Sequence, residues 1–192
     1  AELTEAVKTF TRIHTGGRSE VITFFSPKGK SGKTTLVSNL AVAMARKVNE
    51  PVAIIDADFQ FGDQSVFLNL RPQSTITEAI RDIEFLSPVT LKPYFVKVSE
   101  NLHVLCGASK PEQVDVVTID KFTSLINMVK SLYGYVLIDM PSGFSDITAT
   151  ACELSTRTIL MTMYNGGYEV VHMRRALEIF KAWDDYEKRV EL

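Results

Sequence analysis

The sequence has little of three features that would each indicate a specialised class of protein. Its 192 residues include two cysteines, carry a net charge of −2, and contain no apolar run of the roughly 18 residues that a membrane-spanning helix needs. Cys106 and Cys152 have apolar neighbours, so we expect reduced thiols in the core of a cytoplasmic protein. The charge balance provides no general attraction to nucleic acid or anionic lipid, and no segment is predicted to cross a bilayer.

The start of the chain lacks an initiator methionine and has no signal-peptide character. Residues 1–19 combine a weak helical pattern with a Thr-Gly-Gly-Arg-Ser stretch, which predicts a linker or leading helix. Residues 20–192 are predicted to form one domain, long enough for a substantial core. We expect the chain to be a piece of a longer protein, truncated at its C-terminal end.

Short apolar runs alternate with helical patterns along this domain. We expect strands at residues 21–25, 52–56, 102–106, 135–139 and 158–163, with an extra short strand at 94–98. Their nearly continuous Val, Ile and Leu content is typical of strands that are covered on both faces. Helices are expected at residues 33–48, 75–84, 118–132 and 167–183. The pattern predicts an α/β fold: a three-layer sandwich with a mostly parallel central sheet and helices on both faces.

A phosphate-binding loop stands between the first predicted strand and the first predicted helix. Residues 26–35 are Ser-Pro-Lys-Gly-Lys-Ser-Gly-Lys-Thr-Thr. In this strand–loop–helix context, backbone N–H groups and the positive end of the helix favour a polyanion. Lys33 is placed for the β- and γ-phosphates, and Thr34 for a magnesium ion. The residues expected to bind the nucleotide are Gly29, Lys30, Ser31, Gly32, Lys33, Thr34 and Thr35.

Aspartates follow two of the predicted strands. Residues 54–58 are Ile-Ile-Asp-Ala-Asp, and residues 136–139 are Val-Leu-Ile-Asp. Ligands of open α/β sheets bind beyond the carboxyl ends of the strands, so these carboxylates are expected beside the phosphate loop. Thr34, Asp56 and Asp139 would hold the magnesium ion, the aspartates through its waters. Asp58 is placed to orient or deprotonate an attacking water. Any one of these aspartates is also suited to forming a turn at a strand end.

These features together resemble the deviant Walker ATPases, also called the MinD/ParA or SIMIBI class. The resemblance covers about residues 20–183 and depends on Lys28, the Asp-x-Asp strand end, and Ile-Asp-x-Pro-x-Gly at residues 138–143. It implies an ATP-dependent homodimer with Mg²⁺, in which Lys28 reaches across to the partner's nucleotide. A cation supplied in this way neutralises charge on the transferring phosphoryl group. Lys28 and Asp58 are therefore the expected catalytic residues.

Within that class, residues 56–72 and 75–80, which include Gln-Phe-Gly-Asp at residues 60–63, are similar to the CpaE/TadZ pilus-assembly branch. Residues 102–112 and 133–143 also fit this branch. The resemblance implies a slow ATPase that positions a pilus or secretion apparatus, recruited to a cell pole or an inner-membrane complex. It also implies a receiver-like domain before residue 1. Bacterial tyrosine kinases share related motifs but favour basic residues and proline where this chain has residues 59–62.

Three departures from the class pattern bear on activity. Pro27 stands at the first glycine of the loop pattern, and Lys30 stands at a glycine that most members have. Because glycine permits a positive φ, Lys30 is either strained or adds a cation near the anion. The chain also ends at Leu192 without the strand whose last residue recognises adenine in this class, so base recognition is expected to be incomplete or to come from elsewhere.

Three other functions remain open. A chromosome or plasmid partition ATPase would bind DNA through a basic patch at Arg174, Arg175 and Lys181, but the overall acidity argues against DNA. A membrane-cycling division regulator needs a basic amphipathic tail, which residues 190–192 do not form, although truncation of the chain would remove such a tail. A degenerate, non-hydrolysing interaction module would retain the fold while the departures in the loop abolish hydrolysis.

Overall fold

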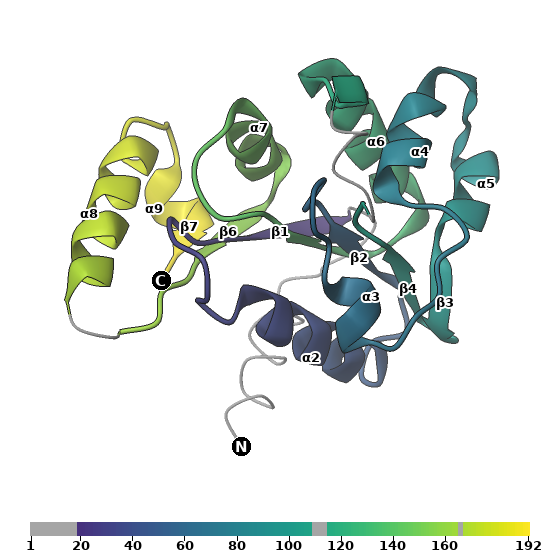
Figure 1. Ribbon diagram of the computed structural model, residues 1–192, viewed down its shortest axis with the longest axis horizontal. Helices are drawn as coiled ribbons and strands as arrows, with labels where there is room; N and C mark the ends of the chain where they lie inside the picture. Colours follow the sequence, from purple (N-terminus) through teal and green to yellow (C-terminus); the bar gives the residue numbers. More distant parts are fainter. Residues whose placement is uncertain (1–18, 109–114, 165–166) are drawn as a thin grey trace.

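The computed structural model describes residues 19–108, 115–164 and 167–192, and one seven-stranded sheet forms its centre (Figure 1). The order of the strands is β3-β4-β2-β5-β1-β6-β7. Neighbouring strands are parallel, except that β3 pairs antiparallel with β4. The strands are β1 (Glu20–Phe25), β2 (Val52–Asp56), β3 (Val96–Ser99), β4 (Leu102–Leu105), β5 (Tyr135–Asp139), β6 (Arg157–Leu160) and β7 (Val190–Glu191).

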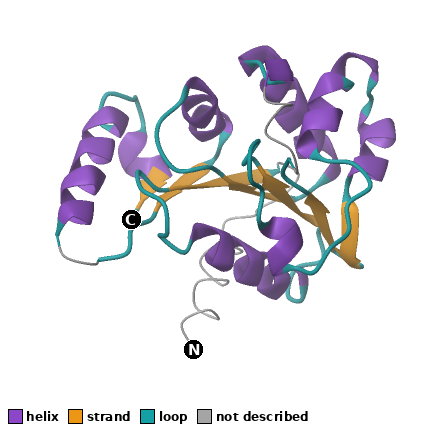
Figure 2. Ribbon diagram, in the orientation of Figure 1, coloured by secondary structure: helices purple, strands orange, loops and turns teal. Residues whose placement is uncertain are grey.

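Helices cover both faces of this sheet (Figure 2). One face carries α2 (Lys33–Ala45) and the short α3 (Gln64–Phe67). The opposite face carries α4 (Ile76–Arg81), α5 (Pro88–Leu91), α6 (Ile119–Leu132) and α7 (Asp146–Leu154). The edge at β6 and β7 is flanked by α8 (Tyr168–Phe180) and α9 (Tyr186–Arg189). The predicted three-layer α/β sandwich is thus confirmed.

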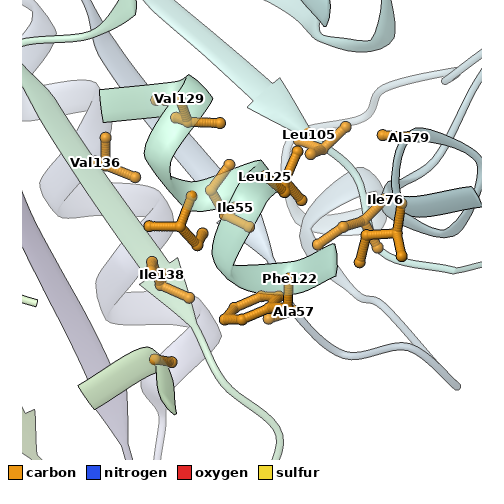
Figure 3. Packing of buried hydrophobic residues seen from close by; sticks show 14 of the residues in the cluster. Ile55, Ala57, Ile76, Ala79, Leu105, Phe122, Leu125, Val129, Val136 and Ile138 are labelled. Atoms are coloured by element: carbon orange, nitrogen blue, oxygen red, sulfur yellow. The ribbon is translucent and has the colours of Figure 1, made fainter. Parts of the chain in front are cut away.

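The central strands are apolar at nearly every position because alternate side chains enter two different core clusters. Ile55, Val136 and Ile138 pack with Leu125 of α6, as Figure 3 shows. The intervening residues of the same strands, such as Leu137, pack with α2 on the other face. A strand covered on both faces cannot alternate apolar and polar residues, which explains the continuous apolar runs.

The predicted elements differ from the observed ones mainly at their ends. The helix expected at residues 75–84 is α4 followed by a 3₁₀ turn at Ile83–Phe85, and the strand expected at 158–163 ends at Leu160. The extra strand expected at 94–98 is β3, preceded by a 3₁₀ turn at Lys92–Tyr94. The sequence did not predict four further helices, α3, α5, α7 and α9. The linker expected at residues 1–19 lies outside the described residues, apart from Ser19. Within the described ranges, no helix is both long and apolar enough to cross a membrane.

A short strand that the sequence did not predict, β7, pairs in parallel with β6. Arg157 of β6 explains the pairing: its Nε and Nη2 donate to the two carboxylate oxygens of Glu191, each at 2.7 Å. Arg189 donates to three carbonyl oxygens at the C-terminal end of α7. Two arginines therefore attach the last residues of the chain to the sheet and to α7.

Candidate functional site

Six of the predicted site residues lie together at the carboxyl ends of β1, β2 and β5: Lys30, Lys33, Thr34, Asp56, Asp58 and Asp139. Asp56 and Asp139 are directly paired positions of β2 and β5, and Asp139 also pairs with Phe24, near the end of β1. A cavity of about 170 Å³ lies there, and its lining residues are Lys30, Lys33, Thr34, Asp56, Asp58, Phe61, Asp63, Asp139, Met140, Pro141 and Ser142. The sheet topology thus brings the phosphate loop and all three aspartates together, as the sequence predicted.

The phosphate loop contains two residues in the left-handed region of backbone conformation. Gly32, which precedes α2, has φ 82°, and Lys30 has φ 61°. A lysine in this region is strained, because its Cβ crowds the backbone. Its side chain also lines the cavity. Lys30 therefore has a strained backbone and also places an additional cation at the cavity. Among the described residues, no side chain caps the N-terminus of α2, which leaves its first N–H groups available to an anion.

Lys33 connects the phosphate loop to the loop that follows β5. Its side chain is largely buried, and its Nζ donates to Ser142 Oγ at 3.2 Å. Burial lowers the pKa of Lys33, while the negative charges of Asp139 and Asp58 act in the opposite direction. The loop after β5 is itself held by Gly143, whose N–H donates to the carbonyl of Ser26 at 3.2 Å. The ammonium group is therefore fixed between two loops at the cavity.

The two paired aspartates are almost inaccessible to solvent. Asp56 is 2% exposed and Asp139 is 4% exposed. Burial raises the pKa of Asp56 to about 7, although its carboxylate accepts hydrogen bonds from the N–H groups of Gln64 and Asp58. Burial also raises the pKa of Asp139, against the opposing effects of Thr34, Gln64 and Lys33. A cation at the cavity would offset the cost of keeping both carboxylates ionised.

Gln64 belongs to this site although the sequence did not indicate it. Its side chain is fully buried, and its Nε2 donates to Asp139 Oδ2 at 2.9 Å. Its backbone N–H donates to Asp56 Oδ2 at 3.0 Å. A glutamine six residues after an Asp-x-Asp strand end has many possible environments, and only the position of α3 places its side chain against Asp139.

The two residues expected to be catalytic lie in different places. Asp58 lines the cavity, and its Oδ1 accepts hydrogen bonds from the N–H groups of Gln60 at 3.0 Å and Phe61 at 2.9 Å, so it also forms a turn. Lys28 does not line that cavity. It is exposed and lines a second hollow of about 300 Å³ with Gly29, Ser31 and Glu169 among others. Thr35 is exposed at the start of α2.

The described residues include no group of three His, Cys, Asp or Glu side chains that converges closely enough to hold a metal ion directly. Magnesium does not need such a group, since it retains several waters and binds substrate phosphates. Asp139 Oδ1 is buried and has no hydrogen-bond partner among the described residues. A buried carboxylate oxygen without a donor fits a hydrated cation, so the residues present suit Mg²⁺.

Comparisons with known proteins agree with this geometry. The sequence profile of the AAA domain matches residues 19–181. The septum site-determining protein MinD of Synechocystis is 29% identical over 146 residues, which make up 75% of this chain and 53% of that protein. The chain spans about half the length of the curated relatives it matches.

Solved structures share the fold. The structure of a ParA family ATPase from Chlorobium tepidum superposes with a TM-score of 0.83 at 18% identity, over 91% of this chain and 72% of that one. The septum site-determining protein MinD from Pyrococcus horikoshii, complexed with Mg-ADP, superposes with a TM-score of 0.71 at 24% identity, over 85% of this chain and 66% of that one.

Proposed function

The chain belongs to the AAA domain family as a P-loop ATPase of the MinD/ParA type, and from that membership we propose an ATP-dependent dimerisation switch. It binds ATP with Mg²⁺, dimerises around the nucleotide and hydrolyses it slowly. Its output is the positioning of a pilus or secretion assembly. The observation that carries the proposal is the cavity at the ends of β2 and β5, where Lys33, Asp56 and Asp139 meet.

The residues of this cavity have distinct roles in the proposed mechanism. The Lys33 ammonium and the free N–H groups of α2 bind the β- and γ-phosphates. The Thr34 hydroxyl would hold Mg²⁺ directly, and Asp56 and Asp139 would hold it through its waters. When bound, Mg²⁺ neutralises charge on the phosphates. Asp58, fixed by its turn, orients the attacking water.

Lys28 has a role that a single copy of the chain cannot supply. Because it is exposed and outside the nucleotide cavity of its own chain, it is available to a facing copy. The similarity of residues 56–72 and 75–80 to the CpaE/TadZ branch supports pilus or secretion proteins as the further partners. The net charge of −2 argues against DNA as the main ligand, although a partition ATPase remains the second candidate.

Nucleotide binding and light scattering test this proposal on the wild type and three variants. Asp58→Ala should bind ATP and accumulate as a dimer, because it forms the complex but hydrolyses poorly. Lys28→Ala should bind ATP and stay monomeric. Lys47→Ala, which removes an exposed lysine near the other end of α2, should behave like the wild type.

An Asp58→Ala variant that stays monomeric with ATP would contradict the switch. A wild type that binds no Mg²⁺–ATP would instead identify a non-hydrolysing interaction module. Binding of DNA with a steep dependence on salt would favour the partition ATPase, since that dependence arises from release of counterions.

A further inference from the structure

We infer that Gln64 is a positioning residue that orients both carboxylates of the magnesium site, an inference that rests on the proposed function. It is the first residue of α3 and has no exposed surface. Its side-chain amide contacts Asp139, and its backbone N–H contacts Asp56. One residue therefore touches the carboxylates at the ends of two neighbouring strands.

The chemistry of Asp139 fixes which way the amide points. An ionised carboxylate only accepts hydrogen bonds, so the nitrogen of the amide must face Asp139 and the oxygen must face away. On the other side, Ser38 Oγ lies 2.8 Å from Gln64 Oε1 and 2.7 Å from the carbonyl oxygen of Thr34. Ser38 has one hydroxyl hydrogen, and either of these two oxygens can accept it. Gln64 thus spans the space between Asp139 and the first turns of α2.

The two carboxylate oxygens of Asp139 differ in their hydrogen bonding. Oδ2 accepts the hydrogen bond from Gln64 at 2.9 Å, whereas Oδ1 is buried with no partner among the described residues. With Oδ2 engaged, the carboxylate cannot rotate without losing a hydrogen bond, and Oδ1 would be held in place to accept a hydrogen bond from a water of a bound ion. Residues that hydrogen-bond to the groups facing a metal ion strongly influence the affinity of the site for that ion.

If Gln64 had only a structural role, replacing its side chain by an apolar one of similar length would not affect Mg²⁺ binding. An apolar side chain of similar length would fill the same space and support the same packing, but it would leave Asp139 Oδ2 without a donor. The backbone hydrogen bond to Asp56 would remain, because it does not depend on the side chain. Gln64→Met therefore separates orientation of Asp139 from packing.

The experiment titrates Mg²⁺ into wild type and variants with a fluorescent ADP analogue bound, and measures affinity for the analogue without metal in parallel. Gln64→Met should weaken the apparent affinity for Mg²⁺ by about 10- to 100-fold, with metal-free binding unchanged. Ser38→Ala retains Gln64 but removes the donor to its oxygen, so it should weaken Mg²⁺ binding by a smaller factor. Ser65→Ala, at the next residue of α3, makes none of these hydrogen bonds and should match the wild type.

The outcomes distinguish the inference from the function on which it rests. Wild-type affinity for Mg²⁺ in Gln64→Met would overturn the positioning role and leave the ATPase proposal intact. An equal loss of metal-free binding would assign Gln64 a structural role and likewise overturn the inference. If Gln64→Met does not fold, unchanged Mg²⁺ affinity in Ser38→Ala overturns it. A wild type that binds neither nucleotide nor Mg²⁺ would overturn both proposals.

Discussion

Gly62 and Gly107 pack backbone against backbone beside the carboxylate of Asp56. A Cβ added to Gly62 would lie 2.5 Å from the Cα of Gly107 and 2.7 Å from Asp56 Oδ2. A Cβ added to Gly107 would lie 2.6 Å from the Cα of Gly62. Two segments that follow β2 and β4 therefore meet over a buried carboxylate, and only glycine allows them to approach so closely.

This contact predicts that neither glycine tolerates alanine. Gly62→Ala and Gly107→Ala should each lower the free energy of unfolding by about 1–3 kcal/mol, because backbone atoms must move to admit the new methyl group. Gly29→Ala is the control, since its Cβ would have no neighbour closer than 3.8 Å. Urea unfolding measures all three. Equal stabilities for the three variants would show that the segments separate without cost.

The left-handed conformation of Lys30 predicts a difference between two variants that both remove its charge. Lys30→Gly relieves the crowding of Cβ, whereas Lys30→Ala retains it. We expect the glycine variant to be more stable than the alanine variant by about 1 kcal/mol in urea unfolding. Both should bind ATP less tightly than the wild type, because both lose a cation that lines the cavity. Unchanged ATP affinity in both variants would show that the ammonium group makes no contribution.

The raised pKa of Asp56 predicts that the nucleotide-free chain loses stability as the pH rises. Its pKa in the folded chain is about 7, above the ordinary value of 3.8, so the folded state binds the proton more tightly than the unfolded state. This contribution is complete below pH 3.8 and is lost as the pH rises through 7. Between pH 5 and 8, the contribution of this group to the free energy of unfolding should fall by about 2.5 kcal/mol.

Asp56→Asn is the variant that isolates this effect. Urea unfolding at several pH values should give a weaker dependence for Asp56→Asn than for the wild type. The pKa of His103 is lowered by burial, which makes stability rise with pH, but this contribution is common to both proteins and cancels in the comparison. Parallel curves for the two proteins would refute the assignment to Asp56.

The ion pairs of Arg157 predict the cost of detaching the last strand. Its side chain is 7% exposed, and it contacts the buried Glu20 at 3.6 Å as well as Glu191. Arg157→Leu should lower the free energy of unfolding by about 3–5 kcal/mol, because it removes a cation from a buried carboxylate. Glu191→Gln should cost less, since Glu191 is 43% exposed.

An exposed ion pair provides the comparison for Arg157. Arg174 and Glu178 pair within one turn of α8, and both side chains are mostly exposed. Arg174→Leu should change stability by less than about 1 kcal/mol. If thermal unfolding shows equal losses for Arg157→Leu and Arg174→Leu, burial is not what gives the Arg157 pairs their importance.

Much of the fold was predictable because the strongest sequence signals are local. Continuous apolar runs gave the five main strands, and the spacing of apolar residues such as Phe122 and Leu125 gave α6. The short helices were not predictable in this way, since four residues, as in α3, are too few to show a period. The last strand was missed for the same reason, because β7 contains only two residues.

The sequence alone determined the chemistry of the site: a phosphate loop with Lys33 and Thr34, and aspartates at the ends of two strands. These residues were recognisable because each stands at a fixed distance from a strand or helix end. Only the tertiary structure decided which groups surround them. Side chains that meet across the sheet, such as Gln64 and Asp139, are 75 positions apart. Burial and hydrogen bonding depend on such distant contacts, so the pKa of Asp56 and the environment of Gln64 follow from the folded chain.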